Sequence, residues 1–128
     1  MLIKLNPESG VPYYLQIVRG IKYLVAAGAL KAGDKVPPVR DLAIQLRINP
    51  NTIAHAYREL QHDGILDGRW GEGNFISADV AKVSEHERER IVAELLEEAI
   101  HQAENVGLHE EPLKRIFSEL LKKRKEKK

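Results

Sequence analysis

The stretch VPPVRDLAIQLRINPNTIAHAYREL, residues 36–60, decides the fold, because it holds two short helical patterns separated by a tight turn. The first pattern places four apolar side chains at spacings i, i+3, i+4 and i+7, which line one face of a helix: Val39, Leu42, Ala43 and Leu46. The second pattern has the same spacing: Ile53, Ala56, Tyr57 and Leu60. The turn between them is Arg-Ile-Asn. Two short helices joined in this way predict a helix-turn-helix unit.

The second of these helices has a strong start signal and a front end with little charge. Asn49 is predicted as its N-cap and Pro50 as its first residue. Asn51, Thr52 and His55 follow on the side away from the apolar stripe. A helix fits the major groove of DNA, where such polar groups read base edges and the helix N-terminus faces phosphates. We therefore expect these polar side chains, Asn49 included, to contact DNA.

Simpler interpretations of the same residues stay open at the level of sequence. Asn49 can serve as a cap alone. Asn51 and Thr52 can form a solvated first turn, and His55 can be merely exposed.

Basic residues supply the remaining candidates for DNA contact. Arg40 lies at the start of the first helix, opposite Leu42 and Leu46, where its guanidinium can pair with guanine or grip a phosphate. The alternative is an ion pair with Asp41 or Asp34. Arg58, on the second helix, either touches a phosphate or supports the structure. Weaker phosphate candidates are Tyr14, Lys35 and Arg69.

A further helix is predicted before this unit. It begins at Pro12, which suits a first helical turn, and stops before Gly28. One face is apolar: Ile17, Ile21, Leu24 and Val25. The segment KAGDKVPP, residues 31–38, is a turn-rich connector.

A β-hairpin is predicted after the unit, from the segments ILDGRW and GNFIS around Gly-Glu-Gly. We expect Ile65 and Leu66 to face Phe75 and Ile76. Trp70 is expected to pack across its own hairpin, with contact to a partner as the alternative. The predicted fold class is therefore mainly α with a small β-hairpin: a winged helix-turn-helix over residues 1–78, followed by a helical region over 79–128.

Two amphipathic helices are expected in the C-terminal region. The first is SEHERERIVAELLEEAIHQAEN, where Ser84 and Glu87 form a capping box, and Gly107 breaks it. The second is HEEPLKRIFSELLKKRKEKK. Two isolated helices cannot bury both apolar faces, so a partner chain is expected. The candidate dimerisation residues are Leu95, Leu96, Ile100, Ile116, Phe117 and Leu120.

Charge is divided along the 128 residues. Residues 1–78 carry nine Lys and Arg against seven Asp and Glu, a net of +2, whereas residues 79–121 have a net of −6. The tail KKRKEKK has a net of +5. We interpret it as a solvated helix end, with nucleic-acid or membrane binding as the alternative.

Composition argues against several other classes of protein. No cysteine is present, which excludes disulfides and thiolate metal sites. No apolar run approaches the length of a membrane span, and we expect a cytoplasmic chain that does not bind membranes. The histidines show no metal-ligand spacing, and we find neither a nucleophile–base pair nor a phosphate loop. We therefore expect no enzymatic activity, cofactor or metal.

Three motifs in order resemble the DNA-binding domain of GntR-type bacterial transcription regulators. They are LKAGDKVPPVRDLA at Leu30–Ala43, NPNTI…AYREL at Asn49–Leu60, and DGIL…GEGNFI at Asp63–Ile76. The short two-helix appendage resembles the YtrA-like branch, which implies that it serves dimerisation. The resemblance further implies a base-reading role for Arg40, a phosphate or base contact for Thr52, and a wing tip at Gly71 and Gly73.

The chain departs from the family pattern at several positions. Pro38 stands where the family often has Ser, and Pro50 and Ala54 stand where other branches place Arg. Arg40 is therefore expected to take over most of the guanine recognition. Glu72 makes the wing tip acidic, which weakens a phosphate grip there.

The predicted function is a homodimeric, sequence-specific repressor that binds a pseudo-palindromic DNA operator. The alternative is a winged helix that acts only as a protein-interaction module, which would not need Arg40 or Thr52. A small-molecule effector between the DNA-binding part and the C-terminal helices stays open, and nothing in the sequence names it.

Overall fold

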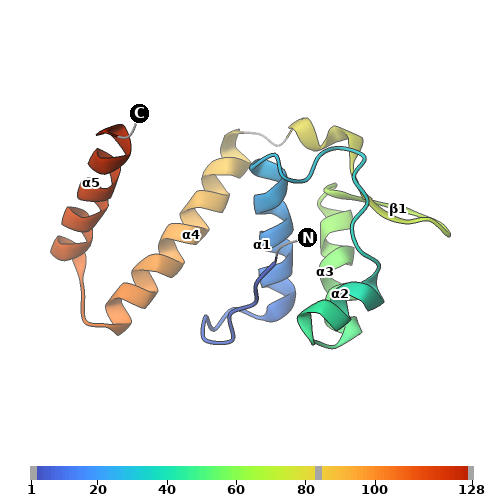
Figure 1. Ribbon diagram of the computed structural model, residues 1–128, viewed down its shortest axis with the longest axis horizontal. Coiled ribbons are helices and arrows are strands. Elements are labelled where there is room, and N and C mark those ends of the chain that lie inside the picture. The colour runs from blue at the N-terminus through green and yellow to red at the C-terminus, as the bar shows by residue number, and fades with distance from the viewer. Residues whose placement is uncertain (1–2, 83–84, 127–128) are drawn as a thin grey trace. The chain divides into compact units, whose positions relative to one another are not determined.

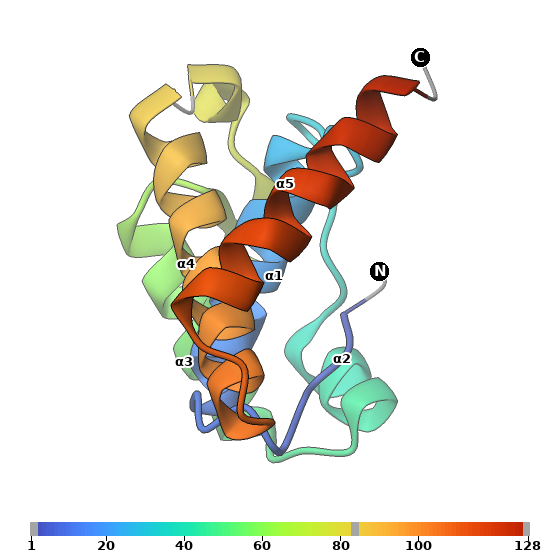
Figure 2. The same cartoon turned by 90° about the vertical axis from the view of Figure 1, so that its left-hand side faces the viewer.

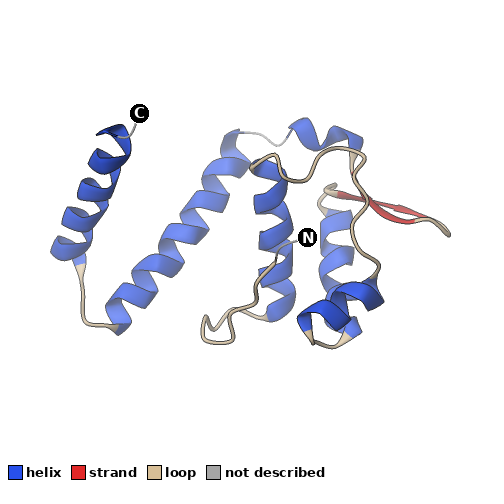
Figure 3. Ribbon diagram, viewed as in Figure 1, coloured by secondary structure: helices blue, strands red, loops and turns tan. Residues whose placement is uncertain are grey.

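The computed structural model describes residues 3–82 and 85–126, and its path is shown in Figure 1. Its elements in chain order are α1 (Tyr13–Ala26), α2 (Val39–Leu46), α3 (Pro50–His62), β1 (Leu66–Arg69), β2 (Gly73–Ile76), a 3₁₀ helix η1 (Ala78–Lys82), α4 (Glu85–Asn105) and α5 (Glu110–Glu126). The predicted fold class is confirmed, with helices and one antiparallel hairpin (Figure 3). The chain divides into two compact units, Met1–Ile91 and Val92–Lys128, and the division falls inside α4.

The N-terminal unit is organised around α3, which packs against α1, α2 and β1. Both apolar stripes predicted for the helix-turn-helix point into its core. The three helices contribute these buried side chains: Ile17, Val18, Ile21, Leu42, Ala43, Ile53, Ala56, Tyr57 and Leu60. Val39 and Leu46 lie partly buried against them. On α1 the prediction missed Val18, which is 5% exposed, because it lies beside rather than on the predicted stripe.

The helix boundaries follow the predicted signals. α1 begins at Tyr13, so Pro12 occupies the cap position rather than the first turn. Gly28, with a φ of +81°, ends that region as expected. Between α2 and α3, Arg47 adopts a left-handed conformation with a φ of 57°, and its N–H bonds back to the α2 carbonyls of Ala43 and Ile44. This capping geometry makes the turn tight.

The hairpin has one register, and it corrects part of the prediction. Leu66 faces Ile76 as expected, but Phe75 faces Asp67 instead of Ile65. Ile65 lies before β1, and its carbonyl accepts the N–H of Ser77 at 2.9 Å. The short turn from Arg69 to Gly73 determines this register, because turn length decides which residues of two strands are opposed.

The connector between α1 and α2 is more ordered than its turn-rich sequence predicts. Its backbone runs along β2: the Gly33 N–H donates to the Ile76 carbonyl at 2.8 Å, and the Ile76 N–H donates to the Asp34 carbonyl at 2.7 Å. The Val36 N–H then donates to the Asn74 carbonyl at 3.0 Å. The connector therefore acts as a short third strand that holds the base of the hairpin.

The C-terminal helices keep much of their apolar surface exposed. Gly107, with a φ of +85°, separates α4 from α5 as predicted, and α5 is one uninterrupted helix (Figure 2). Ser84, the predicted cap, lies outside the described residues. Half-exposed apolar side chains occur on both helices: Val92, Leu95, Leu96, Ile100, Phe117, Leu120 and Leu121. No helix within residues 3–82 and 85–126 is long and apolar enough to cross a bilayer.

Candidate nucleic-acid interface

The N-terminus of α3 is an exposed, capped helix end. The Asn49 Oδ1 accepts the Asn51 N–H at 2.8 Å, and Pro50 occupies the first helical position. The predicted cap is therefore confirmed, and it uses only the oxygen of the Asn49 amide. Asn49 and Asn51 are both exposed, whereas Thr52 is half-buried. The first turn of α3 thus presents amide groups and the positive end of the helix dipole to solvent.

His55 is more constrained than an exposed side chain. Its ring stacks on the Tyr14 ring of α1, with the centroids 3.9 Å apart and the planes at 13°. Its Nε2 lies 3.9 Å from the Glu59 carboxylate, one turn further along α3. The stack joins α1 to α3 beside the exposed helix end. Tyr14 and His55 therefore form one surface feature, and no local sequence pattern predicted it.

Arg40 stands exposed near the start of α2. Within the part of the chain that the structure describes, it forms no ion pair with Asp41 or Asp34. The Asp34 carboxylate instead accepts the Lys31 N–H at 2.8 Å. The structure therefore does not show the alternative ion pair, and the Arg40 side chain is exposed. Arg58 on α3 is also exposed.

The outer face of the hairpin brings two weaker candidates together. The Arg69 guanidinium lies 4.2 Å from the centre of the Phe75 ring, and the Lys35 ammonium lies 6.0 Å from the same centre. Lys35 reaches this position because its backbone pairs with Phe75. Both distances allow a cation–π attraction that holds the charged groups at the ring. Phe75 therefore organises a basic patch that sequence spacing alone did not reveal.

Trp70 contradicts its prediction. Its side chain is fully exposed instead of packed across the hairpin, because it lies in the turn after β1, where no cross-strand neighbour stands opposite. The same turn contains Gly71, with a φ of +75°, and Gly73 follows with a φ of +110°. Backbone of this kind favours glycine. The tip of the hairpin thus presents one large aromatic side chain on a tight turn.

Two hydrogen bonds fix α3 relative to its surroundings. The Tyr57 hydroxyl donates to the Pro37 carbonyl at 2.6 Å, and burial raises the pKa of the Tyr57 phenol, so the group stays a neutral donor. The Gln61 side-chain amide donates to the Asn74 side chain at 2.6 Å. Gly68 makes room for it, since a Cβ there would lie 2.9 Å from the Gln61 nitrogen. These bonds set the angle between α3, the connector and the hairpin.

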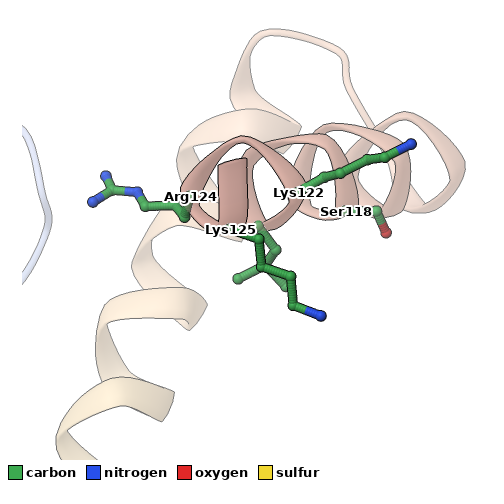
Figure 4. A pocket seen from close by; sticks show the side chains of 5 residues that line it. Ser118, Lys122, Arg124 and Lys125 are labelled. Carbon is green, nitrogen blue, oxygen red and sulfur yellow. The ribbon is translucent and has the colours of Figure 1, made fainter. Parts of the chain in front are cut away.

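A hollow along α5 does not form a small-molecule site. Its lining comes from this one helix: Ser118, Leu121, Lys122, Arg124 and Lys125. Figure 4 shows the long basic side chains spreading outward instead of converging. Within the described residues, no three His, Asp or Glu side chains gather as metal ligands would.

An exposed capped helix, a preceding arginine and a basic hairpin define a winged helix-turn-helix of the DNA-binding type. The family model of the bacterial regulatory proteins of the gntR family matches residues 13–76. The chain belongs to this family, as its sequence motifs indicated.

Known proteins support this assignment over most of the chain. The transcriptional repressor YtrA of Bacillus subtilis (strain 168) is 34% identical over 119 residues, which cover 93% of this chain and 92% of that protein. A transcriptional regulator from Oenococcus oeni has a crystal structure that superposes with a TM-score of 0.61 at 36% identity, covering 94% of this chain and 97% of that one.

A third comparison concerns a complex with DNA. The DNA-binding domain of AraR with operator ORE1 has a TM-score of 0.51 at 26% identity, covering 60% of this chain and 94% of that one. Together with the family membership, these likenesses make the chain a DNA-binding transcriptional regulator rather than a winged helix used only to bind proteins.

Proposed function

We propose that this regulator is a homodimeric repressor that binds a pseudo-palindromic operator, with one winged helix on each half-site. The observation that carries the proposal is the exposed, capped N-terminus of α3, together with the exposed Arg40 on α2 and the basic residues of the hairpin. The repressor YtrA, similar over most of the chain, supports the sign of regulation. As a DNA-binding transcriptional regulator, the protein would act in the cytoplasm.

Base reading and phosphate binding fall to different residues in this proposal. Arg40 and Asn51 present groups that suit guanine and adenine edges in the major groove. Thr52, half-buried, would contact a phosphate or a thymine methyl. Phosphate contacts would come from the helix end at Asn49 and from these residues around it: His55, Arg58, Lys35 and Arg69. The turn with Gly71 and Gly73 would bring the hairpin tip close to the DNA backbone.

Dimerisation is assigned to residues 79–128, with the DNA-binding domain over 1–78. The candidate residues all retain exposed apolar area: Leu95 (51%), Leu96 (40%), Ile100 (46%), Ile116 (36%), Phe117 (48%) and Leu120 (54%). Exposed apolar faces on two consecutive helices are unusual for a soluble monomer. A second copy of the chain that covers them would also supply the second winged helix that a two-fold operator requires.

The test is a titration of labelled operator DNA, selected from a random pool, by fluorescence anisotropy. We expect binding to weaken with salt, and Arg40→Ala to cost about 1–3 kcal/mol and relax discrimination at one base position. The matched control is Arg88→Ala, which removes an exposed arginine of α4 outside the proposed interface. If Arg40→Ala left base discrimination intact, Arg40 would not be a base reader.

A further inference from the structure

The first and last turns of α5 carry opposite charges, although Lys114 and Arg115 follow the two glutamates closely. Glu110 and Glu111 occupy its first turn, and Lys123, Arg124 and Lys125 occupy its last. All of these side chains are exposed. Within the helix, Glu110 pairs only with Lys114, at 2.9 Å, and both side chains remain mostly exposed. Such a surface pair contributes little to stability, so Glu110 can still pair with a basic group of a second chain.

The apolar residues of α5 lie between these charged ends. Leu113 and Leu121 are each four residues from Phe117, so with 100° per residue all three lie within about 40° of one line along the helix. Glu110 and Arg124 are each seven residues from Phe117 and lie on the same line. One face of α5 therefore runs from an acidic end through an apolar stripe to a basic end.

We propose that α5 pairs with α5 of a second copy in an antiparallel orientation, with the two-fold axis at Phe117. This inference rests on the proposed homodimer and adds its orientation and register. About that axis Phe117 meets Phe117, and the partly buried Leu113 meets Leu121, so the half-exposed Phe117 and Leu121 are covered.

The same axis makes the charges complementary. Glu110 of one copy stands opposite Arg124 of the partner, twice by symmetry. A parallel pair would set acidic end against acidic end and basic end against basic end, which is repulsive. The opposite charges of Glu110 and Arg124 on this face thus select the antiparallel orientation, as interhelical charges do in coiled coils.

The first experiment uses the absence of native cysteine. Single-cysteine variants of the full chain are oxidised at low concentration and analysed for disulfide-linked dimers. We expect Phe117→Cys to link to itself, and Leu113→Cys to link to Leu121→Cys in a mixture. Alone, Leu113→Cys and Leu121→Cys should not link. Each cysteine would lie about 12 Å along the helix axis from the same cysteine of the partner, which is beyond the reach of a disulfide.

The second experiment reverses charges without touching the apolar stripe. We expect the variant Glu110→Lys, and separately Arg124→Glu, each to raise the dimer dissociation constant roughly ten-fold, and the equimolar mixture of the two to recover it. Each chain carries the same charge change in the homodimer and in the mixture. Effects on helix stability therefore cancel in the comparison, and circular dichroism checks that α5 stays helical.

The possible results separate this inference from the proposed function. Sedimentation of the unmodified protein as a monomer at every concentration would overturn the homodimer and the pairing together. A dimer in which Leu113→Cys links to itself would overturn the antiparallel orientation alone. A dimer without links at Phe117→Cys or in the Leu113→Cys and Leu121→Cys mixture would show that α5 does not pair with α5. A mixture that fails to recover dimerisation would refute the charge complementarity.

Discussion

In the N-terminal unit Leu60 of α3 is fully buried, whereas in α5 Leu120 is 54% exposed, although both belong to regular apolar stripes. The difference lies in what surrounds the stripes. α3 has α1, α2 and β1 packed around it, while α4 and α5 leave their apolar side chains half-open to water. An apolar stripe therefore predicts that a face will be covered, but not whether its own chain covers it. The first unit buries its own stripes, and in the proposed homodimer a second copy would cover those of the second unit.

The largest expected effect comes from truncating a leucine in each region. Leu60→Ala should lower the free energy of unfolding by about 2–5 kcal/mol, since it removes a fully buried side chain from a packed core. Leu120→Ala should change the unfolding of the N-terminal unit very little and should instead weaken dimerisation. Urea denaturation at several protein concentrations measures both. If both variants lost the same free energy of unfolding at every protein concentration, the proposed difference between the two regions would be wrong.

A smaller effect is expected from the hydrogen bond that ties α3 to the connector. Tyr57→Phe keeps the buried ring and removes the hydroxyl that donates to the Pro37 carbonyl at 2.6 Å. The free energy of unfolding should fall by about 1–2 kcal/mol, because the Pro37 carbonyl loses its hydrogen-bond donor in a partly buried place. Thermal unfolding measures it. Tyr23→Phe, on an exposed tyrosine of α1, is the control and should be neutral. If Tyr57→Phe left the thermal stability unchanged, packing alone would position α3.

The smallest expected effect is a gain in stability at the turn of the helix-turn-helix. Arg47 holds a φ of 57°, a conformation that costs residues with a Cβ about 1 kcal/mol. Arg47→Gly should therefore raise the free energy of unfolding by about 0.5–1 kcal/mol, measured by urea denaturation. Arg58→Gly, in the interior of α3, is a control with the opposite expected sign, and its free energy of unfolding should fall by about 1 kcal/mol. Destabilisation by Arg47→Gly would show that the arginine side chain stabilises the turn.

Local signals in the sequence predicted much of the DNA-binding unit. Apolar spacing predicted the three helices, and the Asn-Pro pair predicted the start of α3, because helix periodicity and capping depend on neighbours within one or two turns. The same reasoning failed for Trp70, which was expected to pack but lies exposed on the turn. It failed because packing of that side chain depends on hairpin register, which the sequence left open.

The sequence by itself determined the helix-turn-helix, the capped front of α3 and the apolar stripes of α4 and α5. Only the tertiary structure decided that Lys35 and Arg69 meet at Phe75, that His55 stacks on Tyr14, and that the connector pairs with β2. Each of these contacts joins residues far apart along the chain. Periodicity and capping report only on near neighbours, so such contacts exist only once the core has brought α1, the connector, α3 and the hairpin together.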